Sequence, residues 1–261
     1  MSDGSTTTTT PPLFSTSQDA QKADLASAEG CRQSILKRPF VQPEGPLPPD
    51  EQAASAREPR RVNVFAGLVG GGGPEGAGWL AAQIMSRKNA DMNRFAFEQL
   101  DVWPRDRVLE IGFGPGRTLD WLVERASEGL VAGVDPAALM VERAARRHSE
   151  AIEAGRLELH CCGVSALPFA DGTFDKAMAA NNFQFWPDYE RDLREVRRVL
   201  RRGGTLLLCL RAETPGRQSY GPVFSRDDVR DAERLLWRAG FGDVRQRHHS
   251  EDSTTLLMAQ A

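Results

Sequence analysis

The sequence VLEIGFGPGR, residues 108–117, joins a short apolar run to three glycines in a G-x-G-x-G spacing. The apolar run predicts a buried central strand, and the helix after the glycines is expected to start near Thr118. Because glycine has no Cβ atom, the backbone N–H groups of Gly112, Gly114 and Gly116 can approach a ligand closely. This stretch therefore predicts a floor against which a small nucleoside-bearing ligand can lie.

Strands and helices alternate on both sides of this turn. Near-continuous apolar strands that alternate with helices indicate a parallel sheet covered on both faces, a doubly wound α/β domain. A helix at 227–239, stopped by Gly240, is followed by two strands joined by a connection so short that the last strand is expected to be antiparallel. The predicted strands are 107–111, 130–135, 157–162, 174–181, 205–210, 241–248 and 254–259, with helices at 118–126 and 137–148.

The residues before the sheet differ in composition. Residues 1–60 are rich in Thr, Ser, Pro, Gln and Ala, and such a segment cannot bury enough apolar surface to offset its ordering entropy, so a disordered low-complexity tail is expected. Residues 61–261 are predicted to form one domain, with a helical lid at 61–103 and a Rossmann-like core at 104–261. Apolar residues at helical spacing predict two short helices, or one bent helix, in the lid. The glycine run 70–73 lacks the Gly-Lys-Ser/Thr ending of a phosphate loop and is interpreted as a hinge.

Composition limits the possible partners. The 261 residues carry a net charge of -3 and a pI near 5.9, which gives no overall attraction to nucleic acid or to an anionic membrane. The four cysteines lack the paired spacing of a zinc site, so no metal is predicted, and buried thiols in a reducing compartment are expected, with Cys161 and Cys162 inside a strand. No apolar run approaches a bilayer-spanning length and no secretory signal is apparent, so a cytoplasmic location is expected.

Polar residues stand where the predicted strands end. Asp135 ends the second strand about twenty residues beyond the glycine turn, where a carboxylate can accept hydrogen bonds from a ribose diol. It could also cap the helix that follows. Residues 163–166 follow the third strand, and Asn181 and Asn182 end the fourth. In an open parallel sheet, ligands bind beyond the carboxyl ends of the strands, so these residues are expected to share one site.

Five sequence motifs occur in a fixed order along the chain. They are VLEIGFGPGR at 108–117, VAGVDP at 131–136, SALPFADGTFD at 165–175, NNFQFWPD at 181–188 and LREVRRVLRRGG at 193–204. Over about residues 77–261 the chain thereby resembles the class I S-adenosylmethionine-dependent methyltransferases, particularly the small-molecule methyltransferases. The resemblance implies a seven-stranded sheet of order 3-2-1-4-5-7-6, S-adenosylmethionine as cofactor, and methyl transfer to a small-molecule acceptor.

The resemblance also implies which residues bind the cofactor. Glu110 and the glycine turn would face the methionine moiety, Asp135 would bind the ribose and Pro136 would flank the adenine. The family often has an acidic residue after the third strand, where this chain has Gly163, which leaves backbone groups to contact the adenine. Asn181 would lie beside the sulfonium, or would satisfy local backbone groups. The expected cofactor contacts are Glu110, Gly112, Phe113, Gly114, Gly116, Asp135, Pro136, Val164 and Asn181.

Acceptor contacts are expected from the elements that cover the open end of the sheet. An amide beside two aromatic faces suits a flat or partly apolar acceptor, although the aromatic rings could equally pack their loop on the sheet. Asn89 lies one helical turn from Asn93, and this pair could face the ligand or the solvent. The expected acceptor contacts are Met85, Asn89, Gln184, Phe185 and Trp186.

Catalytic side chains are not predicted, because none of the four histidines stands in a recognisable base motif. The densest charge cluster consists of arginines and is interpreted as the solvated face of a helix, whose carboxyl end favours cations. Its members are Arg194, Arg197, Arg198, Arg201 and Arg202.

Two alternatives use some of the same features. An NAD-dependent oxidoreductase shares the strand, the glycine turn and the ribose-binding acid, but Pro115 stands where a longer G-x-G-x-x-G turn would continue. A non-catalytic S-adenosylmethionine-binding module is the second alternative, consistent with the missing acid at Gly163. The sequence does not indicate an oligomeric state.

Overall fold

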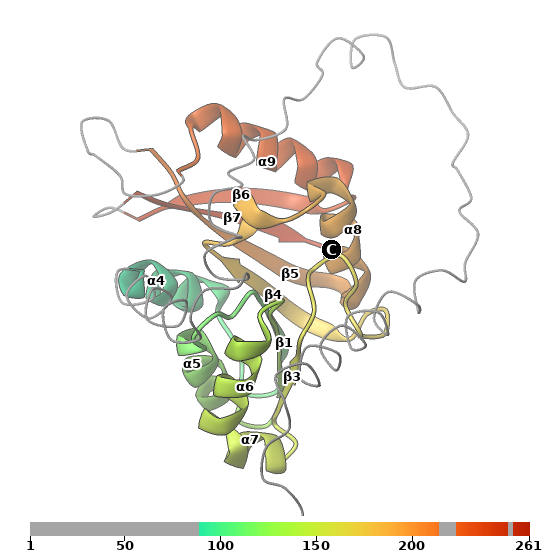
Figure 1. The fold of residues 1–261 in the computed structure, drawn as a ribbon. Coiled ribbons are helices and arrows are strands. Elements are labelled where there is room, and N and C mark those ends of the chain that lie inside the picture. Colours follow the sequence, from blue (N-terminus) through green and yellow to red (C-terminus); the bar gives the residue numbers. More distant parts are fainter. Residues whose placement is uncertain (1–88, 214–222, 250–252) are drawn as a thin grey trace, which may run out of the picture. The chain divides into compact units, whose positions relative to one another are not determined.

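A seven-stranded sheet organises the residues that the computed structural model describes, which are 89–213, 223–249 and 253–261 (Figure 1). Its strand order is β3-β2-β1-β4-β5-β7-β6. The strands β1 to β5 run parallel, whereas β7 is antiparallel to both of its neighbours. The expected strand order and the antiparallel last strand are therefore confirmed. The strands are β1 (Arg107–Ile111), β2 (Leu130–Val134), β3 (Leu157–His160), β4 (Phe174–Ala180), β5 (Leu200–Arg211), β6 (Gly242–His248) and β7 (Thr254–Gln260).

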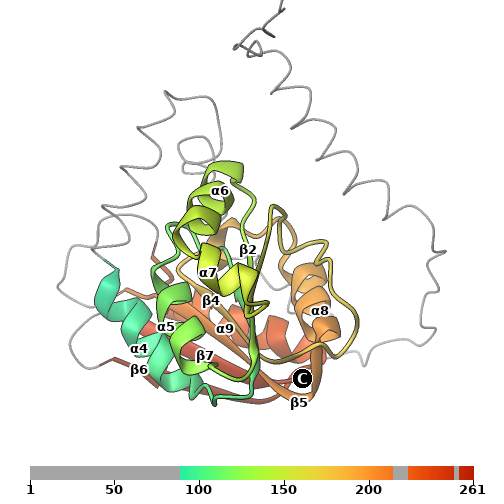
Figure 2. The same ribbon diagram turned by 90° about the horizontal axis from the view of Figure 1, so that it is seen from below.

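Helices cover both faces of this sheet (Figures 1 and 2). The helices α8 and α9 pack on one face and α4 to α7 on the other. Side chains alternate between the two cores along β1, because Leu109 and Ile111 join the α8–α9 side and Val108 joins the α4–α7 side. The helices are α4 (Ala90–Leu100), α5 (Arg117–Arg125), α6 (Ala138–Arg147), α7 (Ser149–Glu153), α8 (Tyr189–Val199) and α9 (Arg226–Arg238), with a 3-10 turn η1 (Phe183–Phe185).

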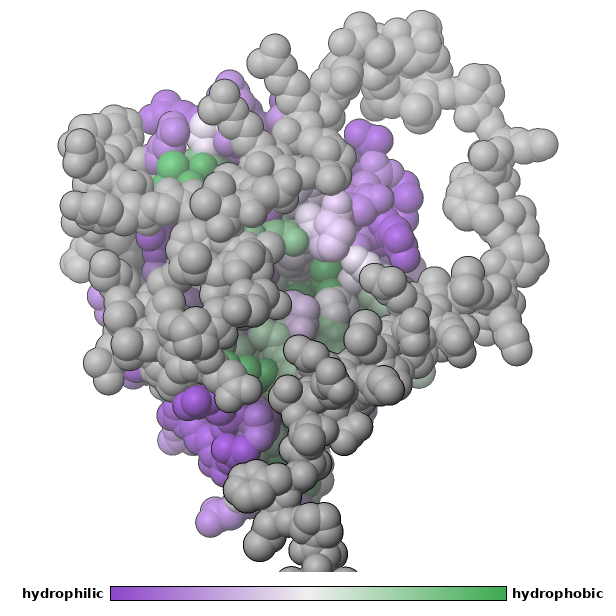
Figure 3. Space-filling view, in the orientation of Figure 1, coloured by the Kyte–Doolittle hydropathy of each residue, from purple (hydrophilic) through white to green (hydrophobic). Residues whose placement is uncertain are grey.

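The outward faces of the helices are polar. Hydrophilic residues gather over α6 and α7 and over α8 in the space-filling view (Figure 3). Two of the helices also begin with capping side chains. Asp188 accepts a hydrogen bond from the backbone N–H of Arg191 at the start of α8, and Ser225 and Asp228 form a reciprocal capping box at the start of α9. These caps position the loops that precede α8 and α9.

Two expectations from the sequence are wrong at strand boundaries. The strand β3 ends at His160, so Cys161 is exposed and Cys162 half-buried, whereas Cys209 inside β5 is buried as predicted. The helix α8 ends at Val199, and the following arginines belong to β5 because Leu200 already pairs with Phe174 of β4. Strand pairing thus overrides the helical appearance of the arginine-rich run.

Several expectations fall outside the described residues. These are the tail at 1–60, the glycine run at 70–73, the first part of the lid with Met85, and Cys31. The second part of the predicted lid forms α4. Within residues 89–213, 223–249 and 253–261, every helix is too short or too polar to cross a lipid bilayer.

Candidate active site

The glycine turn closes the carboxyl ends of β1 and β2. All three of its glycines have left-handed backbone angles, with φ of 68° at Gly112, 52° at Gly114 and 75° at Gly116. The N–H of Gly112 donates to the carbonyl of Val134, 2.7 Å away, which fixes the turn to β2. The side chain of Phe113 points into the core and is 5% exposed, so only its backbone is available to a ligand.

Asn182 locks this turn from the neighbouring strand. Its amide Nδ2 donates to the carbonyls of Ile111 and Gly112, and its Oδ1 accepts from the indole N–H of Trp186 at 3.1 Å. The sequence singled out the neighbouring Asn181 as the ligand contact. The sequence has two successive asparagines at the end of β4, and the second of them, Asn182, holds the turn in place.

We expect Gly112→Ala to destabilise the fold by about 2 to 4 kcal/mol, because alanine would be strained at this φ and its Cβ would overlap the Asn182 amide nitrogen. Gly114→Ala is the matched control, since it is strained in the same way but its Cβ would meet open space. It is expected to cost only about 1 to 2 kcal/mol. Urea unfolding measures both values, and equal losses in the two variants would show that Asn182 does not constrain Gly112.

Asp135 links the glycine turn to the start of α6. Its Oδ2 accepts from the N–H of Gly114 at 2.8 Å, and its Oδ1 accepts from the N–H of Ala137 at 2.9 Å. The carboxylate is 7% exposed. Burial raises its pKa, and the hydrogen bonds from Ala137 and Gly114 oppose that shift. The bond to Ala137 is an Asx-turn contact before α6, whose N-cap is Ala137 and which has no side-chain cap, so the capping alternative is wrong. Each oxygen keeps one further lone pair for a ligand.

Glu110 lies in the interior at the end of β1 and is 3% exposed. Burial raises the pKa of its carboxyl group to about 8, a hydrogen bond with Thr118 opposes the shift, and the charges of Asp135 and Asp120 add to it. Its Oε2 is buried and has no hydrogen-bond partner among the described residues. A buried acid with an unsatisfied oxygen is suited to a cationic or hydrogen-bonding ligand group.

The third strand end differs from the first two. Gly163 is exposed there, as Pro136 is after β2, whereas the side chain of Val164 is 5% exposed and packs in the α8–α9 core. A Cβ at Gly163 would meet no atom within 4 Å. Packing therefore does not explain why glycine stands at this position, and only backbone groups of Val164 are available to a ligand.

The two aromatic residues of the loop after β4 differ in their exposure. Trp186 is 5% exposed and packs edge-on against Phe183, with ring centroids 5.1 Å apart, so it has the packing role that was the alternative for both aromatic residues. Phe185 is 39% exposed. Asn181, at φ 54°, donates its backbone N–H to the carbonyl of Cys209. Gln184 donates Nε2 to the carbonyl of Asn181 at 3.0 Å, while its buried Oε1 has no hydrogen-bond partner among the described residues.

The amino end of α4 is attached to the end of β5. Asn89 is 7% exposed, and its Oδ1 accepts from the guanidinium of Arg211, the last residue of β5. Asn93, one turn further on, is half-buried with an Oδ1 that is fully buried. The pair therefore does not face solvent. Arg211 directly follows the predicted strand 205–210, so it belongs to the elements at the open end of the sheet from which acceptor contacts were expected.

Known proteins resemble this chain in sequence and in fold. A family model described as a methyltransferase domain matches residues 109–208, from β1 to β5. An Aquifex aeolicus protein described as a SAM dependent methyltransferase has the same fold, with a TM-score of 0.57 and 19% identity over 69% of this chain and 97% of that chain. Residues 109–208 therefore form a methyltransferase domain of the class I S-adenosylmethionine-dependent type. The cofactor of the methyltransferase is accordingly S-adenosylmethionine.

Two curated relatives differ in their sequence identity to this chain and in how much of their length it covers. The uncharacterized methyltransferase YdaC of Bacillus subtilis is 26% identical over 63% of this chain and 87% of its own length. The demethylmenaquinone methyltransferase of Thermus thermophilus is 38% identical over 45% of this chain and 52% of its own length. Across five curated relatives other than YdaC, this methyltransferase spans 32% to 52% of their lengths.

Proposed function

We propose that this methyltransferase transfers a methyl group from S-adenosylmethionine to a small-molecule acceptor at the carboxyl ends of β1, β2 and β4. The observation that carries the proposal is the buried carboxyl of Glu110, whose Oε2 has no partner within the described part of the chain, next to a glycine turn that Asp135 braces. A ligand with a cationic ammonium group at one end and a ribose diol further along complements these two acids.

The residues of this edge fit the cofactor as follows. Glu110 would accept from the ammonium of the methionine moiety, and the open face of Gly114 would let the backbone approach the ligand. The free lone pairs of Asp135 would accept from the ribose hydroxyls. Pro136 and the backbone of Val164 would flank the adenine.

The chemistry needs few reactive side chains. When bound, S-adenosylmethionine supplies an electrophilic methyl carbon with a good leaving group already in place. The residues of this chain then need to align the acceptor with that carbon and exclude water. Asn181 and Gln184 stand at the end of β4, where they would orient the reacting groups, and we assign no general base.

The acceptor is proposed to be flat and partly apolar. The exposed ring of Phe185 gives this edge a large apolar face. The Oε1 of Gln184, which has no partner in residues 89–213, 223–249 and 253–261, can accept one hydrogen bond. The Thermus thermophilus relative, whose name specifies a quinone-type acceptor, supports the same class. Asn89 and Arg211, which pair between the start of α4 and the end of β5, would complete the acceptor site.

Titration calorimetry with S-adenosylhomocysteine and with NAD tests the cofactor assignment. We expect saturable binding of S-adenosylhomocysteine and none of NAD, and the reverse result would contradict the proposal. Transfer of a labelled methyl group from S-adenosylmethionine to fractionated metabolite extracts then tests catalysis. Label in a small organic molecule supports the function, whereas cofactor binding without transfer to any fraction would favour the non-catalytic binding module.

A further inference from the structure

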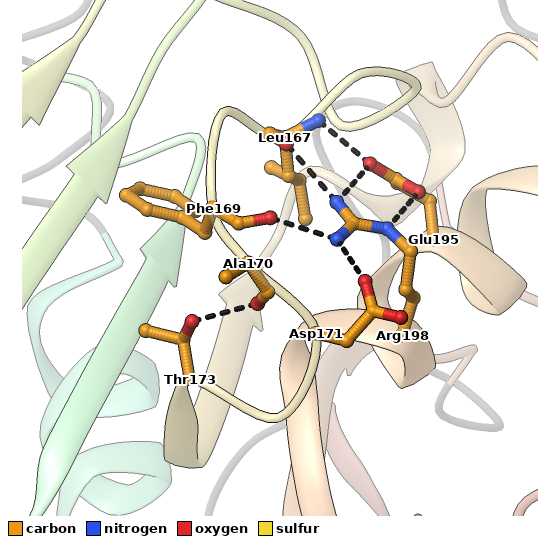
Figure 4. Close-up of polar contacts among 7 residues, drawn as sticks. All are labelled: Leu167, Phe169, Ala170, Asp171, Thr173, Glu195 and Arg198. Atoms are coloured by element: carbon orange, nitrogen blue, oxygen red, sulfur yellow. Dashed lines mark hydrogen bonds and ion pairs between the residues drawn. The ribbon is translucent and has the colours of Figure 1, made fainter.

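The connection between β3 and β4 is attached to α8 through its backbone (Figure 4). The guanidinium of Arg198 donates to the carbonyl of Phe169 at 2.7 Å and to the carbonyl of Leu167 at 3.1 Å. The carboxylate of Glu195 accepts from the N–H of Leu167 at 2.9 Å. Contacts with main-chain atoms fix the path of the connection whatever its side chains are. The solvated helix face expected for Arg198 is therefore wrong.

Glu195 also orients the guanidinium that makes these contacts. Nε of Arg198 donates to one oxygen of Glu195 at 2.9 Å and Nη2 donates to the other at 2.8 Å, a two-pronged pair in the plane of the guanidinium. Asp171, at the far end of the connection, accepts from Nη1 at 2.8 Å. The planar guanidinium of Arg198 thus donates five hydrogen bonds, and a flexible lysine ammonium could not reproduce them.

The same face of α8 contacts the connection one turn earlier. Asp192 is fully buried, its Oδ2 accepts from the N–H of Asp188, and its carboxyl group is hydrogen-bonded to the side chain of Ser165. Residues 192, 195 and 198 are spaced three apart, so they lie along one face of the helix. This face therefore meets the connection from Ser165 to Asp171, directly after Val164.

We propose that Arg198, oriented by Glu195, is a positioning residue that sets how tightly and how selectively the methyltransferase binds the adenine ring of its cofactor. The inference rests on the proposed function, in which backbone groups of Val164 contact the adenine. The chain has no acidic side chain at Gly163 to read the adenine amino group, so recognition at this end depends on where the backbone lies. Arg198 and Glu195 determine that position.

Calorimetry with two probes tests this role. The probes are S-adenosylhomocysteine and its deaminated form, in which oxygen replaces the adenine amino group. The wild-type protein is expected to prefer the first. Arg198→Met is expected to lose about 3- to 10-fold of the affinity for S-adenosylhomocysteine, the range of one or two hydrogen bonds, and to discriminate less between the probes. Arg198→Lys should recover little of this discrimination.

Arg197→Met is the matched control, because Arg197 lies on the same helix and donates Nε to the carbonyl of Gly240, away from the connection. It should keep wild-type discrimination. Wild-type discrimination in Arg198→Met as well would overturn the inference. Failure of the wild-type protein to bind either probe would instead refute the proposed function.

A second variant covers the case in which Arg198→Met does not fold. Glu195→Gln keeps an oxygen that can accept from Leu167 but removes the charged partner of Arg198. Reduced discrimination between the two probes in this variant supports the inference, and unchanged discrimination contradicts it.

Discussion

Replacement of Asp135 with alanine is expected to weaken the binding of S-adenosylhomocysteine about 10- to 150-fold, which corresponds to roughly 1.5 to 3 kcal/mol for charge-assisted hydrogen bonds. The loss has two sources in the structure. The ribose would lose its acceptor, and the N–H groups of Gly114 and Ala137 would lose theirs, so the glycine turn would no longer be braced against α6. Titration calorimetry at a temperature at which circular dichroism shows the variant to be folded measures the effect.

Glu142→Gln is a suitable control for this measurement. Glu142 is an exposed acid of α6 that pairs with Arg146 one turn along the helix, and such surface pairs contribute little. Its replacement should leave cofactor affinity unchanged while removing the same unit of negative charge. If Asp135→Ala bound S-adenosylhomocysteine as tightly as Glu142→Gln, the ribose assignment would be wrong.

Glu110 is expected to make the unliganded protein less stable as the pH rises. Its pKa is about 8 in the folded chain, against an ordinary value of 4.5. Between these values the folded state retains a proton that the unfolded state has released, so the free energy of unfolding falls as pH rises and levels off above about 8. The full loss is roughly 3 to 5 kcal/mol. Urea unfolding between pH 5 and about 9 measures it.

Glu110→Gln isolates this contribution, because glutamine has nearly the same shape and does not titrate. The difference in stability between wild type and variant should change by that amount across the pH range, while contributions from other groups cancel. A pH-independent difference would show that Glu110 is ionised in the folded protein. Wild type and Glu110→Gln also test the proposed contact between Glu110 and the ammonium group of the cofactor. Binding of S-adenosylhomocysteine near pH 7 should release close to one proton from the wild-type protein and none from the variant. Calorimetry in buffers of different ionisation enthalpy measures this release.

Much of the fold could be predicted from the sequence, because β-strands buried on both faces have near-continuous apolar sequences. The run that became β1 has the predicted bounds, and the short link before β7 required an antiparallel strand. The errors lie at boundaries. The arginines after Val199 look helical in isolation, yet Leu200 pairs with Phe174, and this non-local pairing starts β5 five residues before the prediction.

The site was predicted less completely. Asp135 and the glycines were selected because each stands where a strand ends, and their contacts with the cofactor stay predictions. Trp186 was indistinguishable from Phe185 in the sequence, and only packing against Phe183 separates a buried ring from an exposed one. Glu195 and Arg198 were read as surface charges, because their partners are carbonyl and N–H groups, which every residue has.

The sequence by itself determined the alternation of strands and helices, because apolar periodicity and glycine placement are local properties that short stretches carry. The order of its motifs implied the family and the sheet order by resemblance. Only the tertiary structure decided which polar groups act as braces. Asn182 fixes Gly112, Asp135 joins the turn to α6, and Arg198 holds the connection after Val164. The physical reason is that such hydrogen bonds join backbone atoms far apart in the chain, and their energies depend on distances that folding alone sets.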